Sequence, residues 1–306
     1  MIDARRLRTL RAVADHRTVT AAAAALYLTP SAVSQQLAAL EQETGHELLA
    51  RDGRGVRLTA AGEILVTHAD AVLAQLERAE ADLAAYAAGA QGQVTVAAFA
   101  TGITLVLAPA ITTLAAVAPG VRLRVLDAEG DASLPMLLDG QADLAVAVEY
   151  RGAPRADDRR LTRFPLYAEP FEAVLPTGHR LAAGPGPVAM AELADEAWIG
   201  PYPGNPCHDV VLLACEHAGF TPRLMHSSDD FRAVVALASA GAGVALVPRS
   251  ALTGVDLGQV AVRPVDSELA TRKVFAAVRS GAERHPLIRP VLGALAAAAD
   301  ELAVRS

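Results

Sequence analysis

The chain has 306 residues, 52% hydrophobic and 20% charged, a composition that fits a globular protein of about two domains and excludes a disordered chain. Its net charge of −7 gives no general attraction for nucleic acid, but residues 1–58 hold eight arginines against six carboxylates, which permits DNA binding by the N-terminal part. No apolar stretch approaches the roughly 20 residues of a membrane helix, no signal peptide opens the chain, and the two cysteines give no disulfide framework. We therefore expect a cytoplasmic protein without membrane contact.

Three helices are predicted in the first 45 residues. Apolar residues at helical spacing indicate a helix over 3–15, and a second, alanine-rich helix follows over about 18–26. Thr29 is a good N-cap for a third helix that begins at Pro30, where a missing N–H costs nothing, and that ends at Gly45.

Two short helices, a tight turn and a third helix with small polar residues at its start are typical of a helix-turn-helix. Such side chains donate to and accept from base edges and phosphates. A hairpin with an Asp-Gly turn follows and places arginines along the phosphate backbone or in a minor groove. The candidate DNA-binding residues are Thr29, Ser31, Ser34, Gln35 and Gln36 on the helix, and Arg51, Arg54 and Arg57 on the hairpin.

The N-terminal sequence resembles the LysR family of transcriptional regulators. The matching positions are residues 18–22, 28–37, Leu40-Glu41, Gly45, Leu48-Leu49, Arg51 and 58–62. The resemblance implies a winged helix-turn-helix, pairing of subunits into dimers and often tetramers, and a two-lobed effector domain similar to periplasmic solute-binding proteins. Pro30 stands where a Gln is frequent, and Gln35 stands where many members have Arg, so the base preference does not carry over.

A long helix is predicted from the cap at Thr59 to about Tyr86. Its apolar residues alternate four and three apart, which is the seam of a coiled coil, and this favours a homodimer over a single helix packed on its own domain. The seam residues are Leu65, Ala69, Val72, Leu76, Ala79, Leu83 and Tyr86. A short glycine-containing linker, residues 89–92, follows.

Strands and helices alternate through the rest of the chain, which predicts an α/β domain of parallel sheets with helices on both faces. Two crossings, near 161–169 and 264–271, indicate two lobes joined by a hinge. We expect a winged helix-turn-helix over 1–58, a linker and dimerisation helix over 59–88, and an effector domain over 92–306. Within the effector domain, lobe I covers about 92–162 and 268–306, and lobe II covers about 163–267.

Ligands of such sheets lie beyond the carboxyl ends of strands, near helix N-termini. Three residues directly after the first predicted strand fit this position, and the resemblance implies that the first of them touches the inducer. The candidate effector-binding residues are Thr101, Gly102 and Thr104 there, Asp127 after another strand, and Tyr202 and Asn205 before a helix of lobe II. Each of them is also an ordinary cap or turn residue, so both interpretations stay open.

Other chemistries are weaker. Cys207 and Cys215 lie in the part of lobe II where peroxide-sensing LysR members carry redox cysteines, although the spacing differs and no cluster of Lys or Arg surrounds them. His208 and His217 would point to opposite sides of one helix, so we expect no metal site. An enzyme needs a catalytic set that cannot be assembled here, and a solute-binding protein needs a signal peptide.

These expectations combine into one mechanism. A dimer or tetramer binds an interrupted palindrome in double-stranded DNA, a small-molecule effector binds between the lobes, and the change in DNA bend affects contact with RNA polymerase. No cofactor, metal or catalytic residue is expected.

Overall fold

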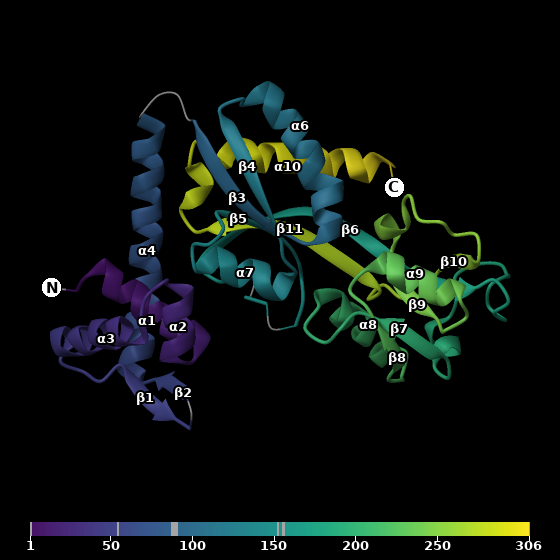
Figure 1. Ribbon diagram of the computed structural model, residues 1–306, viewed down its shortest axis with the longest axis horizontal. Helices are drawn as coiled ribbons and strands as arrows, with labels where there is room; N and C mark the ends of the chain where they lie inside the picture. Colours follow the sequence, from purple (N-terminus) through teal and green to yellow (C-terminus); the bar gives the residue numbers. More distant parts are fainter. Residues whose placement is uncertain (1, 54, 87–90, 152, 155–156, 306) are drawn as a thin grey trace.

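The computed structural model describes residues 2–53, 55–86, 91–151, 153–154 and 157–305. Arg54 and most of the predicted linker lie outside the described residues. Figure 1 shows helices α1–α3 and a small hairpin at one end, the long helix α4 beside them, and the α/β domain extending away from α4.

The N-terminal domain, here called the reading head, is a three-helix unit with a wing. Its elements are α1 (Ala4–His16), α2 (Val19–Ala25), α3 (Pro30–Thr44), β1 (Leu49–Asp52) and β2 (Gly55–Leu58). Local signals set the helix ends: the Thr18 and Thr29 hydroxyls accept backbone N–H bonds at 3.1 and 3.2 Å, and Gly45 closes α3 with φ +71°. Leu10, Val13, Val33 and Leu40 are fully buried between the helices. The predicted helices therefore form within one or two residues of their expected bounds.

The N-terminal part of helix α4 (Ala60–Tyr86) packs against the reading head. A Cβ on Gly62 would lie 2.1 Å from the Leu48 carbonyl oxygen, so a glycine is required at this close approach. The predicted seam divides in two. Leu65 packs on the reading-head core and Ala69 is buried, whereas Val72, Leu76, Ala79 and Leu83 are exposed.

One seven-stranded mixed sheet organises the rest of the chain. Its order is β10 (Val260–Pro264), β6 (Leu161–Pro176), β11 (Thr271–Arg279), β5 (Leu144–Val148), β3 (Gly92–Ala98) and β4 (Val121–Asp127), with β9 (Ala245–Pro248) also paired to β6. Strand β3 runs parallel to β4 and β5, but β11 is antiparallel to β5 and β6. The expectation of parallel sheets is therefore wrong for these strands.

The first predicted crossing, near 161–169, lies in strand β6, but the second, near 264–271, is mostly the turn between β10 and β11. Residues 161–170 and 271–279 pair with each other, with one register shift between Val274 and Phe275, so backbone hydrogen bonds make these two segments part of the sheet. Strand β6 is accordingly 16 residues long and continues from one lobe into the other. The sequence identified only its second half, because the first half lacks an apolar pattern.

Helices cover both faces of this sheet. The remaining elements are α5 (Ala100–Gly102), η1 (Ile103–Leu107), α6 (Ala108–Val117), α7 (Gly130–Leu138), η2 (Met190–Leu193), β7 (Ala197–Gly200), α8 (Pro206–His217), β8 (Arg223–Ser227), α9 (Phe231–Ser239), η3 (Arg249–Leu252), η4 (Ala282–Arg284) and α10 (Ile288–Arg305). In the lobe next to α4, α6 and α10 pack on one face of β3, β5 and β11 and α7 packs on the other (Figure 1). We call this part lobe I. Lobe II is built around α8, α9 and the small parallel sheet of β7 and β8, of which the sequence had not predicted β7.

The helical stretch Ala100–Val117 is long and apolar enough to cross a membrane by length and composition. Buried core helices of soluble proteins meet the same criterion, and Val106, Leu107, Ala110 and Leu114 of this stretch pack in the core of lobe I. Threonines and Pro109 interrupt the apolar run in this part of the sequence, but the helical turns continue through them.

Candidate functional site: a DNA-reading face and an inter-lobe polar cluster

The start of α3 is open to solvent. Thr29, Ser31, Ser34 and Gln35 are all exposed there, as the helix-turn-helix interpretation requires. Gln36 differs: it is half-buried, and its Oε1 accepts a hydrogen bond of 2.5 Å from the Thr9 hydroxyl of α1. Its side chain therefore joins two helices of the reading head instead of facing outward with the others.

The wing carries the other candidate DNA contacts. Arg51 and Arg57 are exposed on β1 and β2, which pair in antiparallel register. The third wing arginine, at position 54, lies outside the described residues. Among the described residues, no ion pair engages either of these two arginines, which suits contact with a phosphate backbone.

A buried cation lies where the two lobes meet. Arg272 of β11 is 1% exposed, and its Nε donates to Glu169 Oε1 of β6 at 2.8 Å. Its Nη2 donates to Thr101 Oγ1 of lobe I at 3.0 Å and to Ser250 Oγ of lobe II at 3.3 Å, and its Nη1 lies 3.9 Å from Cys207 Sγ. We call these five residues the inter-lobe cluster.

Glu169 completes the cluster by neutralising the guanidinium. Its carboxylate also accepts from the Ser250 backbone N–H at 2.8 Å and from the Ser250 hydroxyl at 2.9 Å. A buried charge needs a partner of this kind, because desolvation of an unpaired ion is costly. Arg272, Glu169 and Ser250 were not predicted as site residues, and the one signal for them in the sequence is the Arg272-Lys273 pair at the start of an otherwise apolar strand.

The structure brings only some of the predicted effector residues to this cluster. Thr101 belongs to it. Gly102, the next residue, is buried, and a Cβ there would lie in tight contact with the Phe99 ring, 3.0 Å from its nearest atom. Thr104 is exposed, and its hydroxyl donates back to the Ala100 carbonyl at 3.2 Å. Asp127 is exposed at the end of β4.

The lobe II candidates are held by Asp229. Asn205 caps α8 by accepting from the Cys207 N–H at 2.8 Å, and its amide donates to Asp229 Oδ1 at 3.1 Å. The backbone N–H of Tyr202 donates to the same oxygen at 3.0 Å, while its ring is 55% exposed. Asn205 therefore has the cap role that the sequence left open, and Tyr202 keeps a free side chain.

Glu129 lies just before α7, and the charges of Arg272 and Asp229 act on its carboxyl. Burial, and after it the neighbouring Asp229 and Asp127, raise the pKa of its carboxyl to about 7, against the opposing effect of Arg272. This carboxyl therefore titrates near neutral pH.

Both cysteines are buried free thiols in α8. Burial raises the pKa of Cys207 to about 11, although Arg272 lowers it, and burial raises the pKa of Cys215 to about 12. Thiols in this state are poor nucleophiles at neutral pH. Among the described residues, no group of three or more His, Cys, Asp or Glu side chains is arranged to hold a metal ion.

Comparison with known proteins gives matches to both halves of the chain. Residues 4–63 match the bacterial regulatory helix-turn-helix protein, lysR family, and residues 87–300 match the LysR substrate binding domain. A probable hydrogen peroxide-inducible genes activator of Mycobacterium avium is 35% identical over 252 residues, covering 80% of this chain and 78% of that protein. The uncharacterized HTH-type transcriptional regulator YnfL of Escherichia coli is 28% identical and covers 94% of this chain and 96% of its own.

Solved structures share the fold along nearly the whole length. A mutant OxyR from Corynebacterium glutamicum has a TM-score of 0.62 and 25% identity, covering 99% of this chain and 94% of that one. Full-length CbnR in complex with its target DNA has a TM-score of 0.55 and 23% identity, and the match covers 97% of this chain and 100% of that one. The chain therefore belongs to the LysR family and is a LysR-type transcriptional regulator.

Proposed function

We propose that this protein binds an interrupted palindrome in double-stranded DNA as a homodimer or homotetramer, and that a small molecule bound at the inter-lobe cluster controls that binding. The observation that carries the proposal is the cluster itself. Arg272 is hydrogen-bonded to Thr101 of lobe I and to Ser250 of lobe II, so a ligand at these groups would contact both lobes at once. A ligand that prefers one lobe arrangement shifts the population toward it.

The DNA side of the proposal rests on the exposed start of α3. Ser31, Ser34 and Gln35 are exposed and can reach base edges, and the exposed Arg51 and Arg57 can contact phosphates. Pairing through the exposed half of α4 would present two reading heads to two half-sites. Contact with RNA polymerase and a cytoplasmic location follow from this role.

DNase footprinting of the upstream region of the gene, at about 50 and 200 mM salt, tests the DNA side. We expect a protected interrupted palindrome, and we expect Arg57→Ala to weaken binding to all sequences and to lower the salt slope by about 1. Arg122→Ala, which removes an exposed arginine of lobe I, is the matched control and should leave both unchanged. Equal effects of the two substitutions would contradict the wing assignment.

Small-molecule control is tested by thermal shift of the full-length protein against a metabolite library. A true effector raises the melting temperature of the native protein and loses this effect in Thr101→Val, because mass action stabilises only a state that binds. A ligand whose shift is the same in Thr101→Val binds elsewhere and would count against the inter-lobe cluster.

A thiol switch is the second candidate. The contact of 3.9 Å between Arg272 Nη1 and Cys207 Sγ favours it, and a relative from Mycobacterium avium is named a probable hydrogen peroxide-inducible genes activator. In that reaction the Cys207 thiolate attacks one oxygen of hydrogen peroxide, the O–O bond breaks, and sulfenic acid forms while hydroxide leaves and takes up a proton from solvent. Cys215 lies eight residues further along α8, about 12 Å away by helical rise, so a disulfide requires this helix to unwind.

Burial and the raised pKa of both thiols weigh against this chemistry in the present fold. Treatment of the protein with about one equivalent of hydrogen peroxide, followed by intact-mass analysis, distinguishes the candidates. Rapid addition of one oxygen that is absent in Cys207→Ser would favour the thiol switch. No reaction over hours would leave effector binding as the control mechanism.

A further inference from the structure

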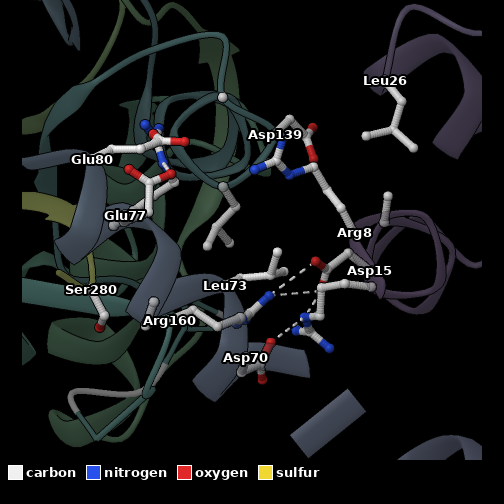
Figure 2. Close-up of a pocket in the computed structure, with 16 residues that line it drawn as sticks. Arg8, Asp15, Leu26, Asp70, Leu73, Glu77, Glu80, Asp139, Arg160 and Ser280 are labelled. Carbon is white, nitrogen blue, oxygen red and sulfur yellow. Dashed lines mark hydrogen bonds and ion pairs between the residues drawn. The ribbon is translucent and has the colours of Figure 1, made fainter. Parts of the chain in front are cut away.

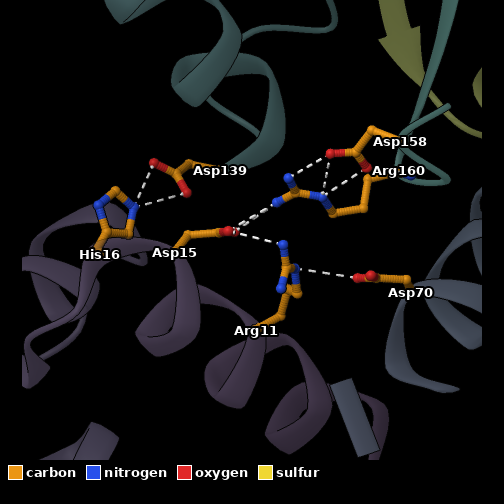
Figure 3. A network of polar contacts seen from close by, with 7 residues as sticks. All are labelled: Arg11, Asp15, His16, Asp70, Asp139, Asp158 and Arg160. Carbon is orange, nitrogen blue, oxygen red and sulfur yellow. Dashed lines mark hydrogen bonds and ion pairs between the residues drawn. The ribbon is translucent and has the colours of Figure 1, made fainter. Parts of the chain in front are cut away.

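The contacts that hold the reading head on lobe I are charged. Nε2 of His16, the last residue of α1, lies 3.1 Å from both carboxylate oxygens of Asp139. Arg160 Nη1 donates to the two oxygens of Asp15 at 2.8 and 3.0 Å, as Figure 3 shows. These four side chains are 8–27% exposed, so water screens them less than ordinary surface pairs. We call these two side-chain pairs the clamp.

Further charges hold the clamp in place. Asp158 binds the other side of the Arg160 guanidinium, with Nη2 and Nε donating at 2.7 and 3.0 Å. Arg11 of α1 donates to Asp15 at 2.8 Å and lies 3.2 Å from Asp70 of α4. The network thus includes α1, α4 and lobe I (Figure 3).

Apolar packing does not seal this junction. Among the described residues, the hydrophobic clusters of the reading head and of lobe I remain separate. A cavity of about 360 Å³ lies beside the clamp, lined by α1, α4 and lobe I together, with Arg8, Leu73 and Asp139 around it (Figure 2). Domain interfaces of this polar kind open and close more readily than hydrophobic ones.

Helix α7 and a pair of strands lead from the lobe I side of the clamp toward the inter-lobe cluster. Helix α7 begins directly after Glu129, whose carboxyl is affected electrostatically by Asp229 and Arg272, and it ends at its C-cap Asp139, which contacts His16. A helix of this length transmits a displacement of one end to the other over about 15 Å.

Two paired strands make a second connection. Glu169 and Arg272 are opposite each other in the register of β6 and β11, and eight residues back along β6 lies Leu161, directly after Arg160 of the clamp. At the same end of β11, Arg279 donates from Nε to Glu77 of α4 at 3.0 Å. The two strands span about 25 Å and are held in register by backbone hydrogen bonds.

We propose that the clamp couples the inter-lobe cluster to the reading head inside one subunit, through α7 and through the β6–β11 pair. This inference rests on the proposed effector control and adds its intramolecular route. Rearrangement at the cluster moves the far ends of these elements, and the side-chain contacts of Asp15 and His16 pass that movement to α1 without bending α4. Because the junction is polar, the clamp has two accessible arrangements, closed and open, that the cluster can bias.

Hydrogen–deuterium exchange of the full-length protein, without DNA or effector, tests the coupling. Thr101→Val and Glu129→Gln each perturb the inter-lobe side. We expect at least one of them to change the exchange rate of the last turn of α1 by twofold or more. In the clamp variant Asp15→Asn/His16→Gln, the same substitutions should still change peptides near residue 101 or 129 but leave α1 unchanged.

Arg6→Gln is the matched control, because it removes an ion pair of α1 with Glu43 inside the reading head and leaves the clamp intact. In that background the response of α1 should persist. Asp139→Asn, on the lobe I side, repeats the test should the α1 variant unfold. The proposal is overturned if neither Thr101→Val nor Glu129→Gln changes the exchange rate of α1 when the clamp is intact. It is also overturned if the exchange rate of α1 changes equally in the clamp variant. Since neither DNA nor effector is present, this failure would leave the proposed function standing.

Discussion

Removing the negative charge of Glu169 should destabilise the effector domain strongly. Glu169→Gln keeps the shape of the side chain but leaves the Arg272 guanidinium, which is 1% exposed, without its counter-ion. The remaining partners, Thr101 and Ser250, are neutral. Removal of one partner from a buried ion pair costs about 3–5 kcal/mol, a large part of the roughly 5–15 kcal/mol that stabilises a domain.

Glu172→Gln provides a matched control on the same strand. Its partner Arg249 has a side chain that is 49% exposed, so water can solvate that guanidinium once the carboxylate is gone. We expect this substitution to cost about 1 kcal/mol or less, because the guanidinium that loses its partner is half exposed to water and is not left as a buried, unpaired charge. The difference between two chemically identical substitutions three residues apart then measures the effect of burial.

Urea unfolding followed by fluorescence measures this difference. The chain has one tryptophan, Trp198, and it is fully buried in the core of lobe II beside Phe171 and Cys207, so its emission reports on the lobe that carries the cluster. Glu169→Gln should lower the midpoint without changing the slope, and Glu172→Gln should barely move it. Equal midpoints for the two variants would refute the argument that Arg272 is buried as a charge.

Three further results are expected. Glu129 has a native pKa of about 7, above its ordinary value, so the free energy of unfolding falls as pH rises toward 7. Glu129→Gln should abolish this fall and be about 1–2 kcal/mol more stable than the native protein at pH 8. Urea unfolding at pH 5 and pH 8 measures this, and an equal pH dependence in the native protein and the variant contradicts it. Gly62→Ala should destabilise the reading head by about 2–3 kcal/mol because its Cβ meets the Leu48 carbonyl, whereas Gly293→Ala, with nothing within 4 Å, should be neutral or stabilising by calorimetry. Leu83, 71% exposed on α4, should lie in a dimer seam, so Leu83→Glu should weaken self-association. Light scattering that finds the same molecular mass for this variant and the native protein would exclude this position from the seam.

The sequence by itself determined what depends on neighbours along the chain. Thr18, Thr29 and Gly45 fix helix ends through hydrogen bonds and backbone angles within four residues, so the reading head was predictable nearly to the residue. The motif around α3 also sufficed to indicate the family, which the comparisons show. Thr101 could be singled out because it directly follows a recognisable strand.

Only the tertiary structure decided what depends on distant partners. Arg272 lies 103 residues from Glu169, and His16 lies 123 residues from Asp139, so no local pattern marks either pair. The same holds for the first half of β6, which becomes a strand because β11 returns beside it. Burial and pairing of charges are properties of the folded arrangement, because both depend on which side chains exclude water around them.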